Sequence, residues 1–165
     1  MDEAEILRYL DEHAIPYRRY PHSPVFTVAE ADAVTPPIPG AGSKNLLLVD
    51  PASARCLLLM APGHKRVDFK RFAPLVGAPK GLRFAPENLL REYLGVGLGA
   101  VTVLGLVNDT GRRVELWLDR ELWQASAVHC HPLVNTATLV ITPPDLERFF
   151  ALTGHPPRLV DVPAA

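Results

Sequence analysis

The chain has 165 residues and a mass of 18.1 kDa, and 17 Lys+Arg side chains against 18 Asp+Glu give a formal net charge of −1. Its 48% hydrophobic and 21% charged residues are typical of a globular protein and exclude a disordered tail or a fibre. The apolar runs are too short to cross a bilayer, the N-terminus is acidic where a signal peptide is basic, and two cysteines cannot form a disulfide framework. We therefore expect a cytoplasmic protein.

Helix and strand patterns alternate along the chain. Apolar spacing and capping residues predict helices over residues 2–13, 27–34, 68–75, 86–94, 119–124 and 142–154. Strand patterns cover residues 17–20, 44–49, 56–60, 101–107, 114–118, 128–131 and 136–141, with short turns at 50–53 and 108–111. Strands joined by such turns rule out a purely parallel sheet. We expect one α/β domain over residues 1–165, a mixed and mostly antiparallel sheet or barrel surrounded by short helices.

The charge is unevenly distributed along the chain. Residues 64–83 carry six basic side chains and one acidic side chain, whereas the segments before and after each carry a net charge of −3. Runs of this kind are most often a solvated face of the protein. The run is nevertheless the best candidate for a surface that contacts phosphates, through Lys65, Arg66, Lys70, Arg71 and Lys80.

A glycine-rich segment, Gly95–Gly99, follows a predicted helix and precedes a predicted strand. Such a segment can present backbone N–H groups and let a ligand approach closely. A dinucleotide fingerprint lies between a strand and a helix, and no GK[ST] follows, so neither nucleotide-binding loop is predicted. A helix C-cap with a turn and a binding loop are equally good interpretations.

Two histidines, His129 and His131, share one face of a predicted strand. This spacing occurs in zinc sites, with a third ligand to come from His22 or His64, but the sequence holds no HExxH or CxxC motif. Histidines that line a pocket or are satisfied in the core are the more common case. Cys130 is expected to face the core on the opposite side.

A lysine, Lys44, begins a predicted buried strand after the flexible segment 40–43. This placement suits a side chain that holds an anionic or carbonyl group at the edge of a cleft, although a solvated lysine at a strand end is the commoner arrangement. None of the serines lies in a GxSxG elbow, and Cys56 has no local base, so no nucleophilic triad is predicted.

Motifs from one end of the chain to the other are similar to those of the YbaK-type, prolyl-tRNA-synthetase-associated editing-domain family. The free-standing alanyl-tRNA(Pro) deacylase branch resembles the chain most. The matching stretches run from about residue 5 to 157 and include YPHSPVFT at 20–27, SKNL at 43–46, FAP at 84–86, YLGV at 93–96, GLVND at 105–109 and HCHPLVNTAT at 129–138.

The resemblance implies an enzyme that hydrolyses the ester of mischarged tRNA(Pro), above all alanyl-tRNA(Pro), without a metal or organic cofactor. The implied partners are the tRNA(Pro) acceptor end and prolyl-tRNA synthetase, with the protein a monomer or a weak dimer. Lys44 would be the key polar residue, and the amides of Gly97, Gly99 and Ala100 would lie near the scissile carbonyl. The matched motifs add the substrate-binding residues His22, Phe26, Thr27, Asn45, His131, Asn135 and Thr136.

The glycine-rich loop departs from the family pattern. Leu98 and Val103 stand where family members commonly have proline, and Ala100 stands in place of a serine. Because no acid–base pair is evident, we expect loop amides to form an oxyanion hole while the tRNA ribose hydroxyl orients the water. Two alternatives stay open: a non-catalytic module that binds tRNA or a synthetase, and a zinc-dependent hydrolase using His129 and His131.

Overall fold

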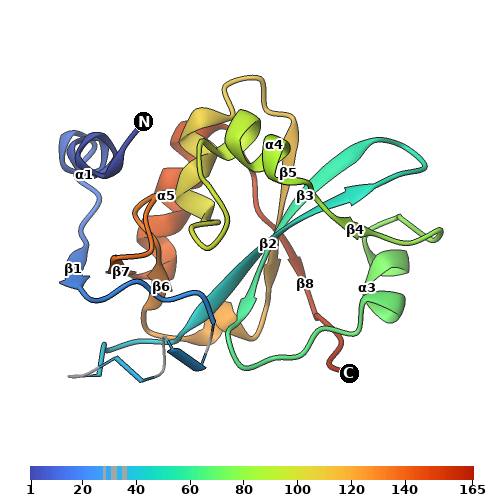
Figure 1. The fold of residues 1–165 in the computed structure, drawn as a ribbon, viewed down its shortest axis with the longest axis horizontal. Coiled ribbons are helices and arrows are strands. Elements are labelled where there is room, and N and C mark those ends of the chain that lie inside the picture. The colour runs from blue at the N-terminus through green and yellow to red at the C-terminus, as the bar shows by residue number, and fades with distance from the viewer. Residues whose placement is uncertain (28, 31–32, 35–36) are drawn as a thin grey trace.

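Two β-sheets of unequal size organise the chain (Figure 1). The computed structural model describes residues 1–27, 29–30, 33–34 and 37–165. The smaller sheet has the order β1-β7-β6, with bounds Arg18–Pro21, Ala137–Ile141 and Val128–Cys130. The larger sheet has the order β4-β2-β3-β5-β8, with bounds Arg83–Phe84, Ser43–Asp50, Arg55–Pro62, Val114–Asp119 and Arg158–Val160.

Strand pairing in the larger sheet is mixed. β2 is antiparallel to both β3 and β4, while β3–β5 and β5–β8 are parallel. The smaller sheet is antiparallel throughout. The predicted α/β fold with a mixed sheet is thus confirmed, and the described strands form two open sheets in place of a closed barrel.

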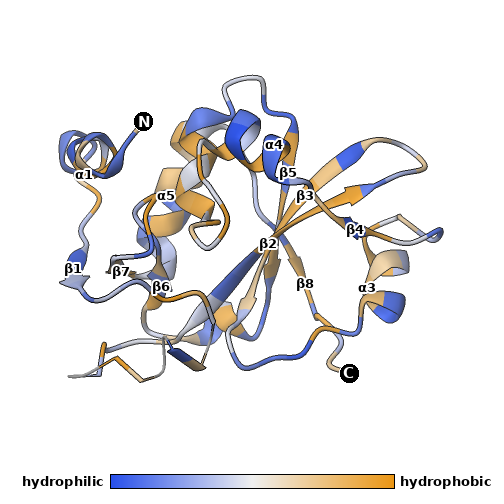
Figure 2. Ribbon diagram, in the orientation of Figure 1, coloured by the Kyte–Doolittle hydropathy of each residue, from blue (hydrophilic) through white to orange (hydrophobic). Residues whose placement is uncertain are grey.

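Both faces of the larger sheet are covered, because its central strands contribute apolar side chains to two separate cores. Figure 2 shows the hydrophobic stretches along these strands. Leu47 and Leu58, paired in register, face the main core, to which helix α1 (Glu3–Glu12) and helix α5 (Pro143–Thr153) also contribute. Their neighbours Leu48 and Leu57 face the opposite way, into a second core covered by helix α3 (Phe69–Leu75).

The helix ends agree with their capping residues. Helix α1 (Glu3–Glu12) begins at a capping box in which Asp2 and Glu5 bond each other's amides, and Asp68 caps α3. Helix α5 (Pro143–Thr153) begins after Thr142 and ends at Gly154 in the left-handed conformation. The predicted helix over residues 119–124 is reduced to the short 3₁₀ turn η3 (Leu122–Gln124).

The helix predicted over residues 86–94 is present but changes its winding. It begins as α4 (Glu87–Leu89) and continues as the π-helix η1 (Leu90–Leu94). Gly95, with φ of 67°, ends it in the left-handed conformation, as the C-cap interpretation of the glycine-rich segment requires.

The strand predicted over residues 101–107 is wrong. This segment contains the 3₁₀ helix η2 (Val103–Asn108), which begins where the Thr102 hydroxyl accepts from the Leu104 amide and the Asn45 side chain accepts from the Val103 amide. Gly105 packs so tightly that a Cβ there would lie 2.9 Å from the Leu94 carbonyl oxygen. The predicted hairpin at 108–111 is therefore also wrong, and β5 pairs with β3 and β8.

Candidate active site

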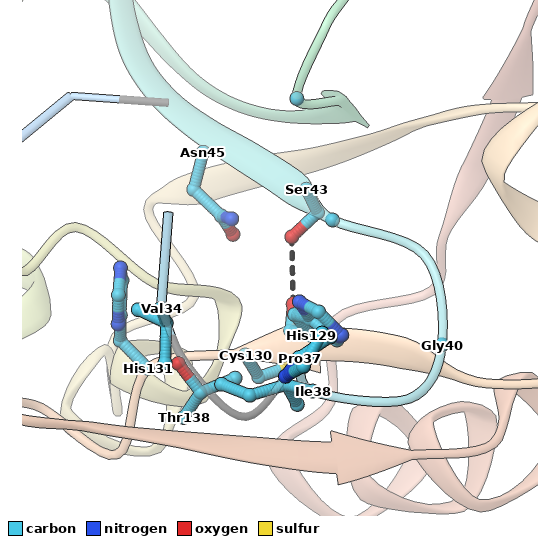
Figure 3. Close-up of a pocket in the computed structure, with 12 residues that line it drawn as sticks. Val34, Pro37, Ile38, Gly40, Ser43, Asn45, His129, Cys130, His131 and Thr138 are labelled. Atoms are coloured by element: carbon cyan, nitrogen blue, oxygen red, sulfur yellow. Dashed lines mark hydrogen bonds between the residues drawn. The ribbon is translucent and has the colours of Figure 1, made fainter. Parts of the chain in front are cut away.

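Two adjoining hollows lie beside the N-terminal half of β2. The smaller hollow, the less open of the two and called the enclosed cavity below, has a volume of about 190 Å³ and is drawn in Figure 3. The larger hollow, called the open cleft, has a volume of about 380 Å³. Ser43, Asn45 and His131 form the wall that the two share. The enclosed cavity is further lined by residues that include His129, Cys130 and Thr138, and the open cleft by residues that include Phe26, Thr27, Lys44 and Gly99.

Lys44 lines the open cleft, as its place at the start of a buried strand predicts. Its side chain is half-buried, and this burial lowers the pKa of its ammonium group. The ammonium donates a hydrogen bond to the backbone carbonyl of Lys65, in the segment that follows β3. An ammonium has three N–H donors, so this bond leaves donor capacity for a substrate oxygen.

The glycine-rich loop forms the opposite side of the cleft at Gly99. Gly99 has a φ of 85°, and a Cβ there would lie 2.8 Å from the ring of Phe26, so glycine is required both by conformation and by space. The Ala100 amide donates to the Gly97 carbonyl at 3.3 Å, which closes a turn within the loop. Ala100 is buried, whereas Leu98 is 66% exposed at the loop tip.

Two asparagines predicted to bind substrate hold backbone segments beside the cleft. Asn45 Oδ1 accepts from the Val103 amide at 2.9 Å and so anchors the C-terminal side of the glycine-rich loop. Asn135 Nδ2 donates to the Val25 carbonyl at 3.2 Å and so anchors the segment that carries Phe26. Their contacts show that both residues shape the cleft.

His131 separates the two hollows as part of the shared wall. Burial lowers the pKa of its imidazole, which favours the neutral ring at pH 7, and its Nδ1 lies 3.4 Å from the Ala137 carbonyl oxygen. His129 Nε2 lies 2.8 Å from the Pro39 carbonyl oxygen and faces the enclosed cavity (Figure 3). The shared face predicted for these two histidines therefore opens onto a cavity.

The histidines considered as a third zinc ligand have other partners. His22 Nε2 bonds the Thr138 hydroxyl at 2.8 Å, and His64 lies at the surface 4.0 Å from Glu121. Among the residues that the structure describes, no three His, Cys, Asp or Glu side chains form a group fit to hold a metal ion. Cys130 is buried in the main core, as predicted, and desolvation raises its thiol pKa to about 12.

The remaining predicted substrate-binding residues differ in their access to the site. Phe26 is 68% exposed at the rim of the open cleft, and Thr27 accepts from the Glu30 amide at 3.1 Å, as its capping role predicts. The rest of the helix predicted to extend to Val34 lies partly outside the described residues. His22 and Thr136 lie behind the cavity wall, where the Thr136 carbonyl accepts from the His22 amide.

The basic segment 64–83 contributes five exposed cations, the predicted Arg66, Lys70, Arg71 and Lys80 together with Arg83. The prediction that Lys65 contacts phosphates does not fit the structure. Its side chain is only 12% exposed, and its ammonium bonds the carboxylates of Asp119 at 2.7 Å and Glu121 at 2.8 Å. Its charge is therefore neutralised inside the protein, through partners more than fifty positions away along the chain that no local sequence pattern indicates.

Comparison with known proteins places these features in a family. Residues 22–149 match the family model of the aminoacyl-tRNA editing domain. The chain is 42% identical over 142 residues to prolyl-tRNA synthetase associated domain-containing protein 1 of Danio rerio, covering 84% of this chain and 76% of that protein. It is 32% identical over 157 residues to the prolyl-tRNA editing protein ProX of Acetoanaerobium sticklandii, covering 95% of each.

A solved structure shares the fold. The crystal structure of a candidate trans-editing enzyme for prolyl tRNA synthetase superposes with a TM-score of 0.74 at 23% identity, covering 100% of this chain and 99% of that one. None of the described helices has the length and apolar character needed to span a membrane. On the family model and these relatives, the chain belongs to the aminoacyl-tRNA editing domain family.

Proposed function

We propose that this protein is a trans-editing deacylase that hydrolyses the ester of mischarged tRNA(Pro), with alanyl-tRNA(Pro) as its main substrate. The observation that carries the proposal is the open cleft, in which Lys44 lies with Gly99 and His131. The names of the matched family and of ProX support the same reaction. The proposal takes residues 1–165 as one editing domain that acts in the cytoplasm on the tRNA acceptor end, beside prolyl-tRNA synthetase.

The proposed reaction uses water as the nucleophile. Water attacks the ester carbonyl, the tetrahedral oxyanion collapses, and the ribose oxygen leaves with a proton to give free amino acid and uncharged tRNA. In this proposal the Lys44 ammonium fixes the substrate, and the amide of Gly99, which lines the cleft, stabilises the oxyanion. Gly97 is not among the residues that line the cleft and lies beside Arg91. The Ala100 amide, used inside the turn, is assigned to shaping the glycine-rich loop. A ribose hydroxyl of the tRNA orients the water.

Selectivity for alanine cannot come from the volume of the enclosed cavity alone. At about 190 Å³ this cavity has room for side chains larger than a methyl group. A difference of one methylene is worth about 1–3 kcal/mol when a pocket discriminates by fit. We therefore assign the exclusion of proline to the shape of the shared wall of Ser43, Asn45 and His131.

Deacylation of a panel of tRNAs tests the proposal directly. Purified protein is incubated with alanyl-, seryl-, cysteinyl- and prolyl-tRNA(Pro), and the ester that remains is measured over time. We expect rapid loss of the alanyl ester and retention of the prolyl ester. Hydrolysis of none of the four, together with retained tRNA binding, would favour the non-catalytic binding module instead.

Replacing His131 by Ala is expected to change selectivity rather than metal content. Removing the neutral ring joins the two hollows, so prolyl-tRNA(Pro) should gain access and the alanyl-to-prolyl preference should fall about tenfold. The ratio of the two deacylation rates measures this effect. The matched control is His13→Ala, at the exposed C-cap of α1. An unchanged ratio, or stoichiometric zinc that is lost with His131, would contradict the assignment.

Reversing three exposed charges in the basic segment should weaken tRNA binding. The variant Arg66→Glu, Lys70→Glu, Arg71→Glu removes up to three phosphate contacts, and each contact contributes a slope of roughly 0.9 to the dependence of log affinity on log salt. We expect a weaker Kd and a shallower salt dependence in a filter-binding titration. The control reverses the same number of charges outside the segment, at Arg8, Arg18 and Arg112. Equal salt slopes for the two variants would refute a tRNA contact here.

A further inference from the structure

The Lys44 ammonium bonds the backbone carbonyl of Lys65, whose own side chain forms a buried ion pair with Asp119 outside the cleft. We propose that Lys65 and Asp119 are positioning residues for the deacylation reaction, holding in place the backbone carbonyl that accepts from the Lys44 ammonium. The inference rests on the proposed function, in which Lys44 fixes the substrate. It assigns Lys65 a role different from the phosphate contact that its sequence context predicts.

Lys65 connects Lys44 to the buried carboxylate of Asp119, through its backbone carbonyl on one side and its ammonium on the other. Its carbonyl accepts the hydrogen bond from Lys44, while its own ammonium donates to Asp119 Oδ2 at 2.7 Å and to the Val162 carbonyl at 3.0 Å. Glu121 supplies a second carboxylate oxygen at 2.8 Å. A side chain bonded to this many partners restricts the backbone of its own residue, and with it the carbonyl that Lys44 uses.

The larger sheet fixes the position of Asp119, the partner of Lys65. Asp119 is the last residue of β5, only 1% exposed, and β5 pairs directly with β3, whose last residues lead into the Lys65 segment. Its second carboxylate oxygen accepts from the Glu121 amide at 3.1 Å, so the group is held from two sides. A buried carboxylate is strongly destabilising without its cation, which makes the pair with Lys65 obligatory in the folded protein.

Backbone contacts hold the same segment from the other direction. The Gly63 amide donates to the Gly42 carbonyl at 3.0 Å, just before β2, and the Lys65 amide donates to the Pro62 carbonyl at 3.1 Å. The segment therefore spans from the start of β2 to the end of β5. Lys44 has a long flexible side chain, and a fixed acceptor reduces the conformations that its ammonium samples before substrate arrives.

Two variants separate positioning from folding. Asp119→Asn keeps the side-chain shape and the bond from the Glu121 amide but removes the charge, and Lys65→Met with Asp119→Asn neutralises both partners so that no buried charge is left unpaired. For each, kcat and KM for alanyl-tRNA(Pro) are measured, and site-resolved mass spectrometry follows the rate at which acetic anhydride modifies Lys44. Thermal unfolding and circular dichroism establish that the variants fold.

We expect kcat to fall about tenfold with KM changed less than about twofold, because misplacement of a positioned group acts on the reacting geometry. Modification of Lys44 should become faster as its ammonium loses its fixed acceptor. Lys65→Arg, which keeps the charge, should retain most of the wild-type kcat. The control Asp161→Asn makes the same chemical change in the exposed Arg120–Asp161 pair and should alter neither quantity.

Folded variants with wild-type kcat and wild-type Lys44 modification rates would overturn the proposal. If the unaltered protein deacylates none of the aminoacyl-tRNAs, the proposed function fails. The modification rates then still decide whether the ion pair holds Lys44. Faster modification in the Asp119→Asn protein supports the positioning role, and equal rates refute it.

Discussion

Replacing Lys44 by Ala is expected to lower the rate of alanyl-tRNA(Pro) deacylation by about 10²–10³-fold, the scale of losing one group that stabilises the reacting centre. Lys44 lines the open cleft together with Gly99 and His131, and its half-buried ammonium bonds the Lys65 carbonyl. Its removal leaves the sheet intact, because the backbone of β2 keeps its pairing with β3. Single-turnover deacylation with excess protein measures the effect without interference from product release.

Two further variants sharpen this result. Lys44→Met keeps the length and apolar stem of the side chain and should be as inactive as the Ala variant, since only the ammonium is missing. Arg8→Ala removes a cation at an exposed position on α1 and should leave deacylation unchanged. Full activity of a folded Lys44→Ala protein would remove Lys44 from the mechanism and leave hydrolysis to the backbone loop and the tRNA.

Replacing Asp109 by Ala is expected to destabilise the fold by about 3–5 kcal/mol, because three donors lose their acceptor and each buried group left unsatisfied costs about 1–3 kcal/mol. Asp109 Oδ2 accepts from the Val114 amide at 2.8 Å and from His155 Nε2 at 2.9 Å, and Oδ1 accepts from the Arg113 amide at 3.1 Å. All of these contacts lie at the point where η2 leads into β5. The variant leaves the buried imidazole and two amides without their partner.

Denaturant unfolding of the wild-type and Asp109→Ala proteins measures the loss of stability as a lower midpoint for the variant. Asp109→Asn is the matched comparison, because its amide oxygen still accepts from a backbone amide while the charge is lost, and it should cost less than the Ala variant. The exposed Asp161→Asn protein should unfold with the wild-type midpoint. A change of less than about 1 kcal/mol for Asp109→Ala would show that water replaces the carboxylate at no net cost.

Elements defined by local chemistry were predictable from the sequence. Capping residues such as Asp2, Asp68 and Thr142 start helices where their hydrogen-bonding side chains predict, and β2 and β3 follow the apolar runs at 44–49 and 56–60. The two-residue strand β4 and the three-residue strand β8 were not predicted. Both exist only through pairing with longer strands, which no pattern of that length reveals.

The segment 101–107 shows where such reasoning fails. Its alternating apolar residues have the composition of a strand, but Asn45, more than fifty residues earlier in the chain, accepts from the Val103 amide and starts a 3₁₀ helix instead. Gly105 then allows this helix to lie directly on Leu94. The error comes from tertiary contacts that override local β propensity.

The candidate site also contains residues that local motifs predict and one whose role depends on long-range contacts. Lys44, Gly99 and His131 were proposed from local motifs, and the fold brings all three to one cleft. The role of Lys65 depended on Asp119, a residue that carries no motif and becomes relevant only because β5 lies beside β3. Sequence patterns identified groups with useful chemistry, and long-range pairing decided which of them face the cleft.

The two cysteines can report on local opening of the two sheets. Cys56 lies in β3 of the larger sheet and Cys130 in β6 of the smaller one, both thiols are buried, and desolvation raises the pKa of each to about 12. Because only the thiolate attacks an alkylating reagent, both buried thiols should react slowly in the folded protein and faster once their sheet opens. Pulsed alkylation therefore distinguishes a protein that unfolds as one unit from one in which either sheet opens first, with no label introduced.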